Sequence, residues 1–288
     1  MGRIRTGLHS SQLRGTLEER AALASRYGYA GVDLSLADAQ KTGDPDAVRA
    51  IFSRYGVEPS SIGGVFAEPL FVGDDRFAAS LQQAPQNARA AAAYGATRTK
   101  IVLWGRAHEP KEQLRPRIVE RLRRMDEALD GSGVRLGLEW VGVRTRHADR
   151  PYPFVQPMTD AIDLLAEVQP RNLGLTLDSF HWYAGGDSLD TIRRTPGKQI
   201  VMLHLSDAPG GPRERLRDED RLIPGEGVIP LADWLRAIDA TGFEGFAAME
   251  LLRPPLADSD PETGARQAMD ALRAVFAAAD LREVAAIR

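Results

Sequence analysis

Short apolar runs alternate with longer amphipathic stretches along almost the whole chain. Eight of the short runs are expected to be strands: residues 4–9, 31–36, 61–66, 99–104, 134–139, 173–178, 200–204 and 246–251. The stretches between them have helical periodicity and capping signals, such as Asp44-Pro45 at the start of one and Gly56 at its end. Strands that alternate with helices predict a parallel sheet covered by helices.

Eight strand–helix units fit a single (β/α)₈ TIM barrel, an α/β fold, over residues 1–288. Two helices are expected between Glu262 and the C-terminal end, so the barrel carries an extra helix there. No proline- or glycine-rich linker divides the chain. The structural alternative is an open doubly wound sheet, which would carry a phosphate-binding glycine turn after its first strand. His9-Ser10-Ser11 stands there instead, so the barrel is favoured.

Polar residues end the last four expected strands: Glu139, Asp178, His204 and Glu250. Side chains alternate between the two faces of a strand, and in all four strands the opposite phase carries large apolar residues. The four polar side chains are therefore expected to point into the barrel mouth, where active sites of this fold lie. Three converging carboxylates would repel one another unless a cation neutralised them. The pattern predicts a metal site.

The types of ligand atom limit which metal ion the site would bind. Three oxygen ligands and one imidazole suit one hard-to-borderline divalent ion, with Mn²⁺ first, Mg²⁺ or Co²⁺ as alternatives and Zn²⁺ behind them. The chain has no cysteine, which excludes thiolate ligands, disulfides and a thiol nucleophile.

Composition excludes several classes of partner. The formal net charge is −3, from 37 Lys and Arg against 40 Asp and Glu, which argues against a nucleic-acid partner. No run approaches the roughly 18–20 apolar residues of a membrane span. The N-terminus lacks an apolar signal core, so the sequence favours a cytoplasmic location.

Four segments carry a resemblance to a known family: Leu136-Gly137-Leu138-Glu139, Leu177-Asp178-Ser179-Phe180-His181-Trp182, Leu203-His204-Leu205-Ser206-Asp207 and Met249-Glu250-Leu251. They resemble the xylose-isomerase-like TIM barrels of the sugar (phosphate) isomerase/epimerase superfamily. The turn that starts at Arg221 also looks like that family's R-x-x-P-G-x-G motif. The resemblance implies a metal site at Glu139, Asp178, His204 and Glu250, and substrate contacts at His181 and Arg221. It also implies a small sugar or keto-sugar as substrate and a homo-dimer or tetramer.

Two stretches depart from the family pattern. The connection between His204 and Arg221 is longer than in the ketose epimerases, and residues 141–157 do not match the epimerase segment that supplies a further substrate carboxylate. Both connections would lie on the active face of the barrel. Their departure from the family pattern therefore affects which substrate is expected more than it affects the expected metal site. No glycine-rich phosphate cradle is present, so a phosphorylated substrate is not implied.

An open divalent ion in a carboxylate-rich mouth suits proton abstraction next to a carbonyl, through a metal-bound enediolate. We expect Glu139 and Glu250 to serve as base and acid of an isomerase or epimerase, each using the oxygen that the metal leaves free. His181 and Arg221 would stabilise the enediolate oxygen. His9 and Trp104, which end the first and fourth strands, either line the substrate pocket or pack in the barrel core.

Three other functions are compatible with this fold. A keto-sugar or inosose dehydratase, or another lyase, would share the early proton abstraction and then expel a β-hydroxyl group. A non-catalytic metal- or sugar-binding accessory protein would keep the barrel without turnover. A metal-dependent endonuclease would need a cluster of three metals rich in histidine, whereas this chain has five histidines and a negative charge.

Overall fold

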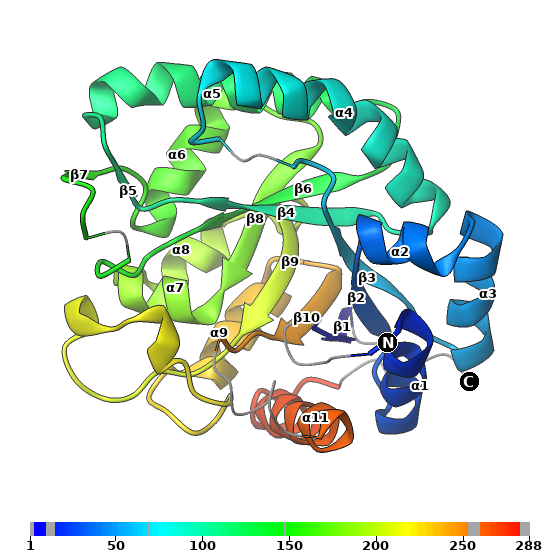
Figure 1. Cartoon of the computed structure of the whole chain (residues 1–288). Coiled ribbons are helices and arrows are strands. Elements are labelled where there is room, and N and C mark those ends of the chain that lie inside the picture. Colours follow the sequence, from blue (N-terminus) through cyan, green and yellow to red (C-terminus); the bar gives the residue numbers. More distant parts are fainter. Residues whose placement is uncertain (1–2, 10–14, 68–69, 147, 253–259, 283–288) are drawn as a thin grey trace.

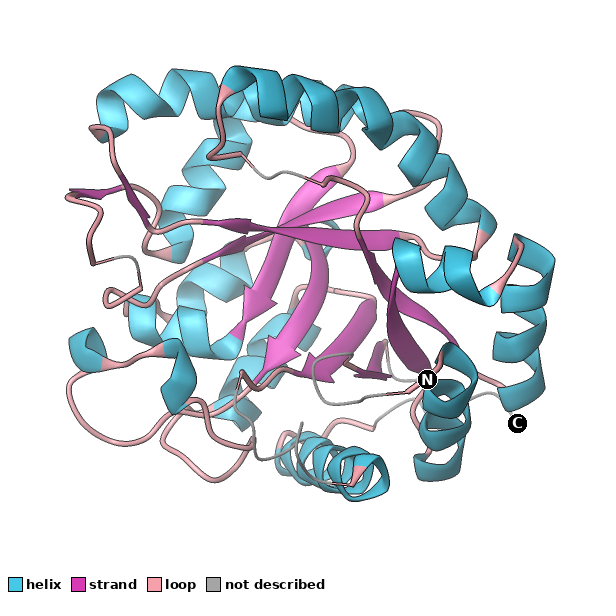
Figure 2. Cartoon of the chain, in the orientation of Figure 1, coloured by secondary structure: helices cyan, strands magenta, loops and turns pink. Residues whose placement is uncertain are grey.

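The computed structural model describes residues 3–9, 15–67, 70–146, 148–252 and 260–282. Its strands lie at the centre and its helices surround them (Figures 1 and 2). The barrel strands are β1 (Ile4–Leu8), β2 (Gly31–Ser35), β3 (Glu58–Gly63), β4 (Arg98–Leu103), β6 (Arg135–Trp140), β8 (Leu173–Asp178), β9 (Ile200–Leu205) and β10 (Gly245–Met249). They pair in parallel in the order β3-β2-β1-β10-β9-β8-β6-β4, and β3 contacts β4, so the barrel is nearly closed. The predicted TIM barrel is confirmed.

The covering helices are α1 (Leu17–Tyr27), α2 (Leu36–Thr42), α3 (Pro45–Tyr55), α4 (Asp74–Ala93), α5 (Lys111–Ala128), α6 (Met158–Val168), α7 (Ser179–Gly185), α8 (Leu189–Arg194), α9 (Leu231–Ala240) and α11 (Pro261–Ala278). Local signals set their ends as the sequence predicts. Asp44 caps α3, and Gly56 closes it with a φ of 63°, in the left-handed region that glycine tolerates. Helix α11 is the expected C-terminal helix. A further helix predicted after it would reach residues 283–288, which lie outside the described residues.

Two short helices and one strand differ from the sequence prediction. Helices α2 and α7 were not expected, because each starts directly where a strand ends. Ser35 and Asp178 close strands β2 and β8, and their side chains cap the next helix along the chain. Strand β3 begins at Glu58, three residues earlier than expected, and it ends at Gly63.

The strand faces alternate as predicted. Leu138, Leu177, Leu203 and Met249 are at most 1% exposed and belong to the hydrophobic core. Inside the barrel, Gly137 leaves room for Thr176, because a Cβ at position 137 would lie 2.1 Å from the Thr176 hydroxyl oxygen. Small residues on one strand therefore accommodate larger ones on the next.

The connections after β4, β6 and β9 contain short elements of their own. Strands β5 (Arg106–Ala107) and β7 (Tyr152–Pro153) pair as a small antiparallel sheet. The connection after β9 contains two short 3₁₀ turns, Arg213–Arg215 and Asp218–Asp220. None of the helices in the described ranges combines the length and apolar character that a bilayer span requires.

Candidate metal centre

The four predicted ligands come together at the carboxyl ends of the strands. Glu139, Asp178, His204 and Glu250 each offer a ligand atom, and these atoms all lie within 4.8 Å of one another. All four residues are buried, between 1% and 7% exposed. The strand register explains the convergence: Asp178 pairs with His204, His204 pairs with Ala248, and Glu250 lies two residues beyond. The stagger of a tilted barrel brings these positions to one place.

The residues present fit a divalent ion. Nδ1 of His204 is 2.7 Å from Oε1 of Glu139 and 3.4 Å from Oε2 of Glu250. In a metal shell with bonds of 2.0–2.2 Å, neighbouring donors lie roughly 3–4.3 Å apart, so small shifts would complete the shell. The donors are three carboxylates and one imidazole, which is the set expected from the sequence.

Asp178 joins strand β8 to helix α7 and is held from two sides. Its Oδ1 accepts the backbone N–H of His181 at 2.9 Å, which begins α7 directly at the barrel mouth. Its Oδ2 accepts from Nη1 of Arg221 at 2.7 Å, and the same nitrogen donates to Oγ of Ser206 at 3.0 Å. Nη2 of Arg221 lies 3.1 Å from Nε2 of His181. The structure therefore brings His181 and Arg221 to the cluster of candidate ligands.

Lys100 is a site residue that the sequence analysis missed. Its Nζ donates to Oε2 of Glu139 at 2.7 Å and to Oε1 of Glu250 at 3.0 Å. Both oxygens that were expected to remain free for proton transfer thus already face an ammonium group. The sequence pattern could have identified Lys100 as a site residue. It is a charged residue whose side chain faces into the barrel from β4, whereas Thr99 and Ile101 face outward.

The chain's own cations dominate the electrostatics of the cluster. Burial by itself would raise the pKa of Glu139, but Lys100 and His204 outweigh it and lower the pKa to about 2. The pKa of Glu250 also falls well below its usual value: burial opposes this, while Lys100 and His204 cause it. Burial and Lys100 disfavour charge on His204, yet Glu250 and Glu139 raise its pKa to about 9. Without a metal, the imidazole is a cation at neutral pH.

His9, which directly follows strand β1, also lies beside Glu250. Its Nε2 is 3.5 Å from Oε1 of Glu250 and 3.7 Å from Oδ2 of Asp33, whose Oδ1 accepts from the Ser61 hydroxyl. The His9 ring packs edge-on against the ring of His204, with centroids 5.2 Å apart. Burial lowers the pKa of His9, which favours the neutral imidazole. His9 is therefore part of the cluster and can also form a triad of potential ligands with His204 and Glu250.

Trp104, just beyond β4, lies against the connection that follows β6. The guanidinium carbons of Arg146 and Arg150 lie 5.7 and 5.6 Å from the centre of its ring. Arg146 also pairs with buried Asp218 at 3.0 Å, and Asp218 lies 3.4 Å from Arg221. A chain of ion pairs thus links the connection after β6 to Arg221 in the connection after β9. Asp218 is buried, although it lies in a stretch of mixed charges, residues 213–220.

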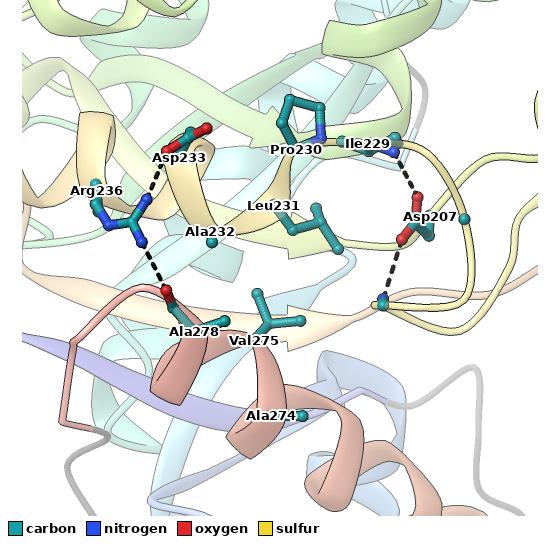
Figure 3. Close-up of a pocket in the computed structure, with 12 residues that line it drawn as sticks. Asp207, Ile229, Pro230, Leu231, Ala232, Asp233, Arg236, Ala274, Val275 and Ala278 are labelled. Carbon is teal, nitrogen blue, oxygen red and sulfur yellow. Dashed lines mark hydrogen bonds and ion pairs between the residues drawn. The ribbon is translucent and has the colours of Figure 1, made fainter.

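Asp207 holds the backbone of the connection after β9. Its carboxylate accepts backbone N–H groups from Ala208, Gly225 and Ile229 at 2.8–3.0 Å and so fixes the turn after Arg221. Figure 3 shows it at the edge of a pocket of about 350 Å³ between helices α9 and α11. None of the four cluster residues is among the described residues that line this pocket.

The fold is a TIM barrel, and a cluster of carboxylates and imidazole lies at the carboxyl ends of its strands. These two features together define a class of barrel proteins. Residues 21–275 match the xylose isomerase-like TIM barrel family, and the chain belongs to that family. A solved structure of a xylose isomerase domain protein from Alicyclobacillus acidocaldarius is 31% identical, with a TM-score of 0.85 over 96% of this chain and 99% of the other.

Two curated relatives are enzymes. The chain is similar to an inosose isomerase from Bacillus licheniformis, 35% identical over 144 residues, which are 50% of this chain and 49% of that protein. It is also similar to a 3-dehydroshikimate dehydratase from Pseudomonas aeruginosa, 29% identical over 136 residues, 46% of this chain and 20% of the relative. The chain thus spans half or less of the length of these relatives.

Proposed function

We propose that the protein is a divalent-metal-dependent isomerase or epimerase of a small sugar or keto-sugar. The convergence of Glu139, Asp178, His204 and Glu250 on one buried point carries this proposal. The inosose isomerase relative supports the reaction class. A divalent ion bound there, with Mn²⁺ first, would act as a Lewis acid that acidifies the carbon next to a carbonyl.

The residues of the chain would divide the proton transfer between them. Glu139 and Glu250 stand on either side of His204. The ionised carboxylate of one can remove a proton from carbon, and the other can return a proton to carbon after it has taken one up from bulk water. Each oxygen of these carboxylates has a second lone pair, so the contact with Lys100 leaves an acceptor position. His181 and Arg221 would stabilise the enediolate oxygen, and His9 and Trp104 would line the substrate pocket.

A dehydratase acting on a keto-sugar is the second candidate, favoured by the similarity to the 3-dehydroshikimate dehydratase. Both reactions begin with the same proton abstraction. They differ in the second step, because a dehydratase expels a β-hydroxyl group as water instead of returning the proton. The products therefore distinguish the two functions.

Proton exchange followed by NMR in D₂O tests the proposal. The Mn²⁺-loaded protein is expected to incorporate deuterium next to the carbonyl of a ketose or keto-inositol and to form an isomer. Glu250→Gln should bind substrate but lose at least about 100-fold in exchange rate. Glu244→Gln, at the exposed residue just before strand β10, is the matched control and should retain the full rate. Retention of exchange by Glu250→Gln would refute the assigned role, and an elimination product would favour the dehydratase.

A further inference from the structure

Lys100 reaches the cluster because of its place in the barrel. Its strand β4 lies beside β6 (Figure 1), and Lys100 pairs with Gly137 while Val102 pairs with Glu139. Lys100 is therefore two residues, about 6–7 Å, below the level of Glu139. An extended lysine side chain spans that distance, and its Nζ reaches Glu139 and Glu250. Only a long cationic residue can contact both glutamates from there.

The contacts place Lys100 and His204 on different oxygens of the same two carboxylates. His204 faces Oε1 of Glu139 and Oε2 of Glu250. Lys100 takes the remaining oxygens, Oε2 of Glu139 and Oε1 of Glu250. The ammonium group is therefore beside the candidate metal ligands without occupying the side on which the imidazole offers its nitrogen.

The charges of the cluster show what Lys100 does. The three carboxylates of Glu139, Asp178 and Glu250 carry −3, Lys100 and Arg221 supply +2, and His204 adds +1 while its imidazole is protonated. Two buried glutamates this close would repel each other strongly if no cation lay between them. The sequence argument assigned that neutralisation to a metal alone, whereas the structure provides part of it from the chain.

We propose that Lys100 is the resident counter-ion of Glu139 and Glu250, and that Lys100 and a divalent ion hold this pair from opposite sides. Because both are cations acting on the same two carboxylates, each weakens the binding of the other. Lys100 is thus a positioning residue that keeps the two glutamates together before the metal binds. This inference rests on the metal site of the proposed function.

Metal binding and thermal unfolding of Lys100→Met test the proposal. Methionine keeps the length of the side chain and removes its charge. In EDTA, we expect a melting temperature several degrees below that of the wild type, and saturating Mn²⁺ should remove most of the difference. By titration calorimetry, the Kd for Mn²⁺ should be at least tenfold lower than in the wild type. Lys111→Met is the matched control, since Lys111 pairs with Asp160 on the outside of the barrel, and its Kd should not change.

An equal or higher Kd for Mn²⁺ in Lys100→Met would overturn the proposal, because a purely structural lysine would leave metal affinity unchanged or reduce it. If Lys100→Met does not fold, Lys100→Gln, which keeps a hydrogen-bond donor, carries the same comparison.

A metal-independent measurement separates this proposal from the proposed function. If the wild type binds no Mn²⁺, the metal-dependent function fails, and the counter-ion role is then decided by unfolding in EDTA. Lys100→Met should cost less than half as much stability in a Glu250→Gln background as in the wild type, since one of the two repelling charges is gone. Independent, additive effects of the two substitutions would overturn the counter-ion role.

Discussion

Metal binding to this protein should displace a proton from His204. A ligating imidazole must be neutral, yet Glu139 and Glu250 raise the pKa of His204 to about 9 in the metal-free protein. The two glutamates have lowered pKa values and carry no proton at neutral pH. Below pH 9, each ion bound should therefore release about one proton, and that proton should come from His204.

The pKa of His204 determines how strongly the Kd for the metal depends on pH. While His204 is protonated, the apparent Kd should fall about tenfold for each unit that the pH rises. Between pH 6.5 and 8.0, we expect Mn²⁺ to bind about thirtyfold more tightly. Above pH 9 the dependence should level off, because the imidazole is then already neutral.

Calorimetric titration with Mn²⁺ at several pH values measures this directly. Repeating it in two buffers of different ionisation enthalpy gives the number of protons released. His108→Gln, which removes an exposed histidine, is the control and should show the wild-type pH dependence. A Kd that changes less than threefold over this range, with no proton released, would refute the reasoning.

Two further predictions concern stability. Gly137→Ala should lower the free energy of unfolding in urea by about 1–3 kcal/mol, because the new Cβ would meet Oγ1 of Thr176. Adding Thr176→Ala should recover most of this loss, whereas additive losses from the two substitutions would contradict the explanation. Burial raises the pKa of Asp187 from 3.8 to about 6, with Asp160 adding to the effect, although Asp187 accepts the N–H of Met158. The stability that this raised pKa contributes is present below pH 3.8 and is lost as the pH rises through 6. Asp187→Asn should therefore gain on the order of 1–2 kcal/mol over the wild type at pH 7 and nothing at pH 3.5, and an equal gain at both would refute the assignment.

The sequence by itself determined the barrel and the four members of the cluster. Both come from local rules: side chains alternate along a strand, and capping residues such as Asp44 and Gly56 mark helix ends. The same phase at four strand ends was enough to identify Glu139, Asp178, His204 and Glu250 as neighbours. Short helices that begin at a strand's last residue escaped these rules, because one residue serves both elements.

Only the tertiary structure decided what the cluster contacts. Lys100 lies 39 residues from Glu139 and 150 from Glu250, and it meets both because of the register of β4 and the length of its side chain. Arg221 likewise reaches Asp178 from a long connection whose path no periodicity predicts. Strand stagger and side-chain reach are properties of the closed barrel. They changed the interpretation of the site: the three carboxylates do not depend on a metal alone for neutralisation, because Lys100 and Arg221 already contact them.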